Sequence, residues 1–289
     1  MIYQNKIIIT PEINNLIEKT LSEDLFLGDI TTESLISTSE IGKALVIAKS
    51  AGTLAGSDIF IAILKKVNSN LTINQLVEES KQFQKKDIIF EIYGSVTSIL
   101  QAERTALNFL QRISGIATIT KTFCQKVHIY KAKIIDTRKT IPGLRELDKY
   151  GVKIGGGRNH RFNLGDGILI KDTHIQIMKN KGFELKDIIE KAKQNISHNM
   201  KIEIEVESLE DLKKAIVAKP DTIMLDNMSL NDMTEAVKIC NGQILLEASG
   251  GVNLENVEDI AKTGVDLISI GEITHSVKII DLSLKFEHK

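Results

Sequence analysis

A cluster of basic side chains between residues 136 and 174 is the most distinctive chemical feature of the sequence. Its members are Arg138, Lys139, Arg145, His160, Arg161 and Lys171. They lie among the glycines of the segment GGGRNHR (155–161) and among short apolar runs, so a solvated helix face is the weaker interpretation. Arginine binds carboxylates and phosphates through paired, charge-assisted hydrogen bonds, which also fix the plane of a ligand. The cluster therefore predicts a site for a small ligand that carries several negative charges.

Two later loops have the composition of a phosphate site. The segments ASGG (248–251) and ISIG (268–271) each lie at the end of an apolar run. Glycine lets backbone N–H groups approach an anion and turn toward it. Ser-Gly-Gly alone is weak evidence because turns use the same residues. The pair is stronger, since loops after consecutive late strands form the phosphate site of many α/β barrels.

Acidic side chains fall on strand faces that should point away from the covering helices. Strand side chains alternate in direction, so Glu203 and Glu205 share one face of their predicted strand. Asp226, Lys171 and Glu247 lie on the corresponding faces of their own strands. A buried charge is costly unless it is paired, solvated or bound to a ligand. An internal ion-pair network is the alternative, but the neighbouring loops favour an active site at the C-terminal strand ends, where barrel enzymes carry out their chemistry.

Glu205 and Asp226 are the candidate ligands for a divalent cation. Both lie at or near the ends of predicted strands. Mg²⁺ is usually bound by few carboxylates together with substrate phosphates. The same two acids could instead accept hydrogen bonds from ribose hydroxyls. The sequence has no His/Cys cluster typical of zinc.

Length and composition describe an ordinary globular protein. The chain has 289 residues, a formal net charge of −1 and 42% hydrophobic residues, so no overall field would recruit nucleic acid or an anionic membrane. No apolar run approaches the length of a membrane span, and the N-terminus lacks the pattern of a signal peptide. Cys124 and Cys240 are far apart in sequence, which predicts reduced thiols in a cytoplasmic protein.

The elements before residue 130 alternate irregularly and predict an α+β unit. Thr10 is a candidate N-cap, and Pro11 fits the first position of the first helix. The other elements are predicted as strands at 44–49, 52–55 and 87–93 and as helices at 57–67 and about 98–126.

After residue 130, strands and helices alternate regularly, which predicts parallel strands with right-handed crossovers. Six strands are expected at 134–136, 168–171, 202–206, 222–226, 244–248 and 267–270, with a seventh near 157–162. A small or incomplete α/β barrel fits this pattern best, and a doubly wound sheet is the alternative. The final run, 280–286, alternates strictly and predicts a strand that returns to the first part of the chain.

The sequence resembles the quinolinate phosphoribosyltransferase family over almost its whole length. The matching segments are ED (23–24), GDITT (28–32), AGTLAG (51–56), ERTALN (103–108), DTRK (136–139), GGGRNHR (155–161), LDN (225–227), SGG (249–251) and IGEITHS (270–276). The long middle signature is highly specific. The resemblance implies an α/β fold with an N-terminal α/β sandwich (1–115, joined by a strand within 276–289) and a seven-stranded open α/β barrel (116–275). It also implies a homodimer or a larger assembly.

The resemblance further implies a reaction and roles for individual residues. Quinolinate would accept the phosphoribosyl group of phosphoribosyl pyrophosphate and lose a carboxylate, with Mg²⁺ as the only cofactor. The catalytic residues would be Lys139, Lys171, Glu205 and Asp226, of which the two acids would serve phosphoribosyl pyrophosphate and the metal. The substrate-binding residues would be Arg104 (reaching into the partner subunit's site), Thr137, Arg138, Lys139, His160, Arg161, Lys171, Ser249, Gly250, Gly251, Ser269, Ile270 and Gly271.

Two positions depart from the family pattern, and both flank expected ligands without replacing one. Ile141 stands where the family usually has threonine, and Thr173 stands where asparagine is common. A related enzyme that acts on nicotinate and a molybdenum-transport-associated homologue are alternatives. A catalytically silent binding protein is the third. The full set of cations favours a dicarboxylate substrate, because a monocarboxylate needs fewer of them.

Overall fold

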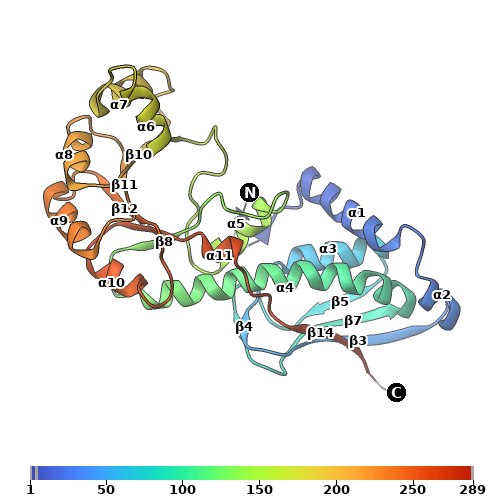
Figure 1. The fold of residues 1–289 in the computed structure, drawn as a ribbon. Helices are drawn as coiled ribbons and strands as arrows, with labels where there is room; N and C mark the ends of the chain where they lie inside the picture. The colour runs from blue at the N-terminus through green and yellow to red at the C-terminus, as the bar shows by residue number, and fades with distance from the viewer. Residues whose placement is uncertain (1, 4–5, 288–289) are drawn as a thin grey trace. The chain divides into compact units, whose positions relative to one another are not determined.

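The computed structural model describes residues 2–3 and 6–287, and Figure 1 shows the course of the chain. The residues cluster into two compact units. The first comprises Met1–Lys121, Gly143–Gly156 and Val277–Lys289, and the second comprises Thr122–Pro142 and Gly157–Ser276.

The first unit is built around an antiparallel sheet with the strand order β14-β3-β7-β5. Two further pairs, β1-β2 and β4-β6, form small sheets of their own. The strands of the unit are β1 (Ile2–Tyr3), β2 (Lys6–Ile7), β3 (Ile41–Ala48), β4 (Gly52–Thr53), β5 (Thr72–Gln75), β6 (Gln82–Phe83), β7 (Ile88–Ser95) and β14 (Leu282–Phe286). The helices of the unit are α1 (Pro11–Leu25), α2 (Ile30–Leu35), α3 (Ser57–Val67), α4 (Val96–Lys126) and α5 (Arg145–Ile154). The last residues of α4, after Lys121, belong to the second unit.

Two predictions for this unit are confirmed. The first helix begins at Pro11, and Thr10 Oγ1 accepts a hydrogen bond from the Ile13 N–H at 3.2 Å. The final run forms β14, which pairs with β3 so that Leu282 lies opposite Ala48. An alternating strand at the end of the chain thus completes the first sheet.

Helix α5 clusters with the first unit, whereas the division made from sequence at residues 115 and 116 assigned it to the barrel. Its side chains Leu147, Tyr150 and Ile154 are buried in the same hydrophobic core as residues of α3 and α4. Helical periodicity predicts which face of such a helix is apolar, but it does not say which core that face enters.

The second unit contains six parallel strands in the order β8-β13-β12-β11-β10-β9. They are β8 (Lys133–Ile135), β9 (Ile168–Ile170), β10 (Ile202–Val206), β11 (Thr222–Asp226), β12 (Leu245–Ser249) and β13 (Leu267–Ser269). The helices are α6 (Asp172–Lys179), α7 (Leu185–Gln194), α8 (Leu209–Val217), α9 (Leu230–Cys240), α10 (Val257–Lys262) and α11 (Glu272–His275). Helices α8, α9 and α10 lie along the outer side of β10, β11 and β12 (Figure 1). The six predicted strands are confirmed, and the sheet is an open barrel of parallel strands.

The seventh strand is reduced to a single parallel bridge between Ile135 and Arg158. The next residues bond to a side chain instead of a strand. Asp136 accepts hydrogen bonds from the His160 N–H at 2.7 Å and from Asn159 Nδ2 at 2.8 Å. This carboxylate turns the segment away from sheet pairing after one bridge.

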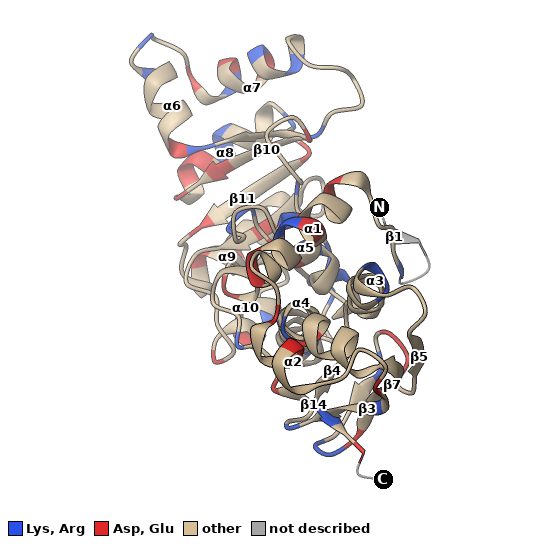
Figure 2. Ribbon diagram, turned by 90° about the vertical axis from the view of Figure 1, so that its right-hand side faces the viewer, with Lys and Arg blue, Asp and Glu red and all other residues tan. Residues whose placement is uncertain are grey.

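Charged residues of both signs are interspersed on the helices, as α7 shows in Figure 2. This distribution agrees with the formal net charge of −1. Within the described part of the chain, every helix is too short or too polar to cross a bilayer.

Candidate active site

A cavity of about 640 Å³ lies at the C-terminal ends of the parallel strands in the second unit. The side chains reach it from the end of each strand and from the segment around His160. The predicted residues that line it are Thr137, Arg138, Lys139, His160, Arg161, Lys171, Glu205, Asp226, Ser249, Gly250, Gly251 and Ser269. Residues that are far apart in sequence therefore share one cavity, at the C-terminal strand ends where the sequence predicted an active site.

Two guanidinium groups, those of Arg138 and Arg161, lie close to each other in this cavity. Burial lowers the pKa of Arg161, and the positive charge of Arg138 lowers it further. Arg138 Nε is buried and has no hydrogen-bond partner, while Arg161 Nη1 donates to the Gly167 carbonyl at 2.9 Å. A buried donor without a partner carries a free-energy cost that an anionic ligand would remove. The pair is suited to binding a carboxylate or phosphate.

Lys171 and Glu205 form an ion pair at the ends of adjacent strands β9 and β10. Lys171 Nζ lies 2.8 Å from Glu205 Oε1. The lysine side chain is 44% exposed and the glutamate side chain 11%, so the cation is the more accessible partner. Asp226, at the end of β11, accepts a hydrogen bond from Asn227 Nδ2 at 3.1 Å. Lys171 thus provides a cation that could bind the carboxylate of a ligand. Glu205 and Asp226 provide two acids that could hold a divalent metal.

A layer of acidic side chains lies inside the barrel, next to His160. Its Nε2 is 2.9 Å from Glu203 Oε2 and 3.9 Å from Glu247 Oε2. Burial raises the pKa of Glu247, and the negative charge of Glu203 raises it further. The three residues are close enough together to hold an ion, so they are a second candidate for metal binding beside Glu205 and Asp226.

The two predicted phosphate loops meet in an adjoining cavity of about 420 Å³. Residues 249–251 line it together with Ile270 and Gly271. Gly250 and Gly251 have φ angles of 95° and 60°, in the left-handed region that glycine adopts without strain. The backbone can therefore turn here without a side chain between it and a bound anion.

Gly250→Ala is expected to disturb this loop more than Gly251→Ala. A Cβ at Gly250 would lie 2.1 Å from Asn227 Oδ1 and 3.0 Å from the Asn227 backbone nitrogen, whereas a Cβ at Gly251 would meet no atom within 4 Å. Both positions have positive φ, so the matched pair separates the steric clash from backbone strain. We expect the affinity of the loop for a phosphate-bearing ligand to fall more in the first variant, as a binding titration would measure. Equal effects would contradict the role of the Asn227 contact.

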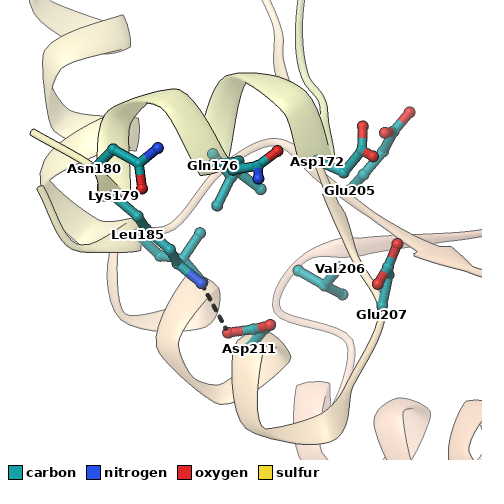
Figure 3. A pocket seen from close by; sticks show the side chains of 10 residues that line it. Asp172, Gln176, Lys179, Asn180, Leu185, Glu205, Val206, Glu207 and Asp211 are labelled. Carbon is teal, nitrogen blue, oxygen red and sulfur yellow. Dashed lines mark ion pairs between the residues drawn. The ribbon is translucent and has the colours of Figure 1, made fainter.

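A smaller cavity of about 350 Å³ lies between α6, β10 and α8 (Figure 3). Figure 3 shows Glu205 and Asp172 close together at one side of it. At the other side, Lys179 Nζ lies 3.9 Å from Asp211 Oδ1. Glu205 lines both this cavity and the larger one, so its carboxylate lies between them.

Several residues line the large cavity without having been assigned a role from the sequence. They are Leu169, Asp172, Met224, Asn227 and Glu247. A signal for Glu247 was present, since it shares a strand face with Ser249. Arg104 is exposed on α4 in the first unit, and its part in the site stays a prediction.

Sequence profiles of both halves of one enzyme family match this chain. The profile described as "Quinolinate phosphoribosyl transferase, C-terminal domain" matches residues 116–285, and the corresponding N-terminal profile matches residues 29–114. The chain belongs to the quinolinate phosphoribosyltransferase family. The family expected from the sequence motifs is thereby confirmed.

Known proteins resemble the chain over nearly their full lengths. The "Probable nicotinate-nucleotide pyrophosphorylase (carboxylating)" of Bacillus subtilis is 40% identical over 276 residues, which cover 94% of each sequence. The "Nicotinate-nucleotide pyrophosphorylase (carboxylating)" of Mycobacterium leprae is 38% identical over 274 residues, which cover 93% of this chain and 95% of the other. The solved structure of the nicotinate-nucleotide pyrophosphorylase from Francisella tularensis superposes with a TM-score of 0.92 at 40% identity and covers 98% of both chains. The expected two-part fold of the quinolinate phosphoribosyltransferase family is confirmed.

Proposed function

We propose that this chain transfers the phosphoribosyl group of phosphoribosyl pyrophosphate to quinolinate with decarboxylation. The products are nicotinate mononucleotide, pyrophosphate and carbon dioxide, in the biosynthesis of NAD. The observation that carries the proposal is the pair of neighbouring guanidinium groups of Arg138 and Arg161, one of them with an unpartnered buried donor, in a cavity that glycine loops also line. Quinolinate has two carboxylates on neighbouring ring atoms, and such a group of cations suits a planar dianion.

In this proposal, Arg138, Lys139, Arg161 and Lys171 bind the two carboxylates of quinolinate. Charge-assisted hydrogen bonds from the guanidinium groups fix the plane of the ring, and the lysines neutralise its charge. The lysines bind and orient the substrate and form no Schiff base. The cations thereby hold the pyridine nitrogen in place for attack on the ribose, which replaces a random encounter by an ordered complex.

Phosphoribosyl pyrophosphate is assigned to the acids and the glycine loops. Its 5′-phosphate would bind at residues 249–251, Ser269, Ile270 and Gly271, which line the adjoining cavity. Glu205 and Asp226 would hold Mg²⁺, because hard oxygen ligands in small number suit this ion when substrate phosphates complete its shell. Mg²⁺ would neutralise charge on the departing pyrophosphate.

The reaction proceeds in two stages. Pyrophosphate leaves the ribose with its bonding electrons, and the pyridine nitrogen forms the new bond to the ribose carbon. The quaternised nitrogen then accepts electron density as the bond to the adjacent carboxylate breaks and carbon dioxide leaves. A proton replaces the carboxylate on the ring. Preorganised cations stabilise the charge that develops during these steps.

The proposal is tested by measuring carbon dioxide and pyrophosphate release from quinolinate and phosphoribosyl pyrophosphate, with and without Mg²⁺. We expect both products in equal amounts, with release dependent on Mg²⁺ and much slower turnover when nicotinate replaces quinolinate. Turnover of nicotinate alone would indicate the related phosphoribosyltransferase. Binding of quinolinate without release of either product would indicate a binding protein.

We further propose that the enzyme is a cytoplasmic homodimer in which Arg104 completes the site of the neighbouring subunit. Arg104 is exposed on α4, and Cys240 is a buried free cysteine, as a reducing compartment favours. Mixing inactive Arg104→Ala and Lys171→Ala proteins should restore part of the activity, because some mixed dimers would have one intact site. No recovery after verified subunit exchange would contradict the shared site.

A further inference from the structure

The imidazole ring of His160 is engaged by the protein through both of its nitrogens. Nδ1 accepts a hydrogen bond from the Arg161 N–H at 2.7 Å. A ring nitrogen that accepts carries no hydrogen, so the hydrogen of the neutral ring lies on Nε2. Nε2 is 2.9 Å from Glu203 Oε2 and donates to it. This arrangement also argues against a metal at the cluster of His160, Glu203 and Glu247, because the protonated Nε2 has no lone pair to offer.

Glu203 contacts His160 from the side away from the proposed substrate. His160 and Glu247 line both the large cavity and a second one of about 520 Å³ whose other lining residues include the first residues of β9, β11 and β13. Glu203 lines the second cavity and is not among the residues that line the first. Its carboxylate can therefore act on the reaction only through a neighbouring group.

The backbone of His160 is also held by a hydrogen bond. Its N–H donates to Asp136 Oδ1 at 2.7 Å, directly after β8. The ring contacts Glu203 of β10 through Nε2, and Glu247 of β12 lies beside it. Asp136, which follows β8, and Glu203 of β10 thus hold the segment that leads into Arg161.

We infer that His160 is a positioning residue for Arg161 and that Glu203 holds the His160 ring in place. The ring nitrogens of His160 do not bind the carboxylates of quinolinate. This inference rests on the proposed function. The Nδ1 contact fixes the Arg161 N–H, and the Glu203 contact fixes the ring. Together they hold the Arg161 guanidinium in the wall of the cavity. An arginine that binds one face of a planar dianion loses much of its effect when it is misplaced by about 1 Å.

Two variants of Glu203 test the inference by kinetics. Glu203→Ala removes the acceptor for Nε2, and Glu203→Gln keeps an acceptor oxygen at the same position. We expect the alanine variant to raise KM for quinolinate about tenfold or more, with a smaller change in kcat and in KM for phosphoribosyl pyrophosphate. The glutamine variant should retain KM within about threefold of the original. Equal losses in both variants, or a rise in both Michaelis constants together, would overturn the inference.

Nitrogen-15 NMR of the histidine rings provides a test that needs neither a variant nor turnover. The original protein should show the His160 ring with hydrogen on Nε2 and none on Nδ1, and both signals should stay in place when quinolinate is added. A large shift of either nitrogen on addition of quinolinate would show direct binding and overturn the inference. If quinolinate gave no products at all, the proposed function would fail. The tautomer of His160 would still show whether its Nε2 donates a hydrogen bond to Glu203.

Discussion

Replacing Lys171 by alanine is expected to lower kcat/KM for quinolinate on the order of 10²- to 10³-fold. Lys171 is the accessible partner of its ion pair with Glu205, and its side chain lines the large cavity. Its loss removes a cation for the substrate and leaves a nearly buried carboxylate without that partner. Steady-state kinetics with each substrate varied in turn would measure the effect.

Lys179→Ala is the matched control for this variant. Lys179 is also paired with an acid, at 3.9 Å from Asp211, but it lines the smaller cavity beside α6. We expect kcat/KM to stay within about twofold, as for most surface substitutions. Adding Glu205→Gln to Lys171→Ala should not restore activity, since neither change replaces the lost cation. A Lys171→Ala enzyme with more than about a third of the original kcat/KM would refute the assignment.

Asp148→Ala is expected to cost about 3–5 kcal/mol in the free energy of unfolding of the first unit. Asp148 is fully buried, and Arg112 on α4 binds both of its oxygens, with Nε and Nη2 each at 2.9 Å. The change would leave the guanidinium of Arg112 partly buried without this carboxylate. A loss of this size lowers Tm by roughly 6–20 °C, which calorimetry and urea unfolding would measure.

The double variant Arg112→Met/Asp148→Leu should recover much of this loss, because apolar side chains of similar size can replace a buried ion pair. Glu210→Ala is the surface control, since it removes an exposed pair with Lys214, and little change in Tm is expected. If Asp148→Ala lowered the unfolding free energy by less than about 1 kcal/mol, the pair would behave like an exposed one.

The sequence determined where the six parallel strands of the second unit lie. Strands β10 and β11 have the predicted bounds, since parallel strands covered by helices need apolar runs at regular intervals. Alternation within those strands also predicted that Glu205 and Asp226 would reach the same cavity, which they do. Both patterns are local, so they can be recognised without knowledge of the partners.

The tertiary structure alone decided which charged groups pair. Lys171 and Glu205 are 34 residues apart, and Arg112 and Asp148 are 36 apart. Their meeting depends on strand order and helix packing, which no local periodicity specifies.

The structure also decided how the segment around His160 is used. The sequence predicted a strand near residues 157–162, and the family resemblance implied that His160 binds a carboxylate of the substrate, which stays untested. The structure places one bridge, at Arg158, and a ring that is held by Glu203 and the Arg161 N–H. The reason is that Asp136, fully buried after β8, accepts the backbone N–H of His160 and the side-chain amide of Asn159, so the His160 N–H does not pair with a strand. Side-chain acceptors compete with sheet pairing for the same backbone donors, and only the folded chain shows which acceptor lies within reach.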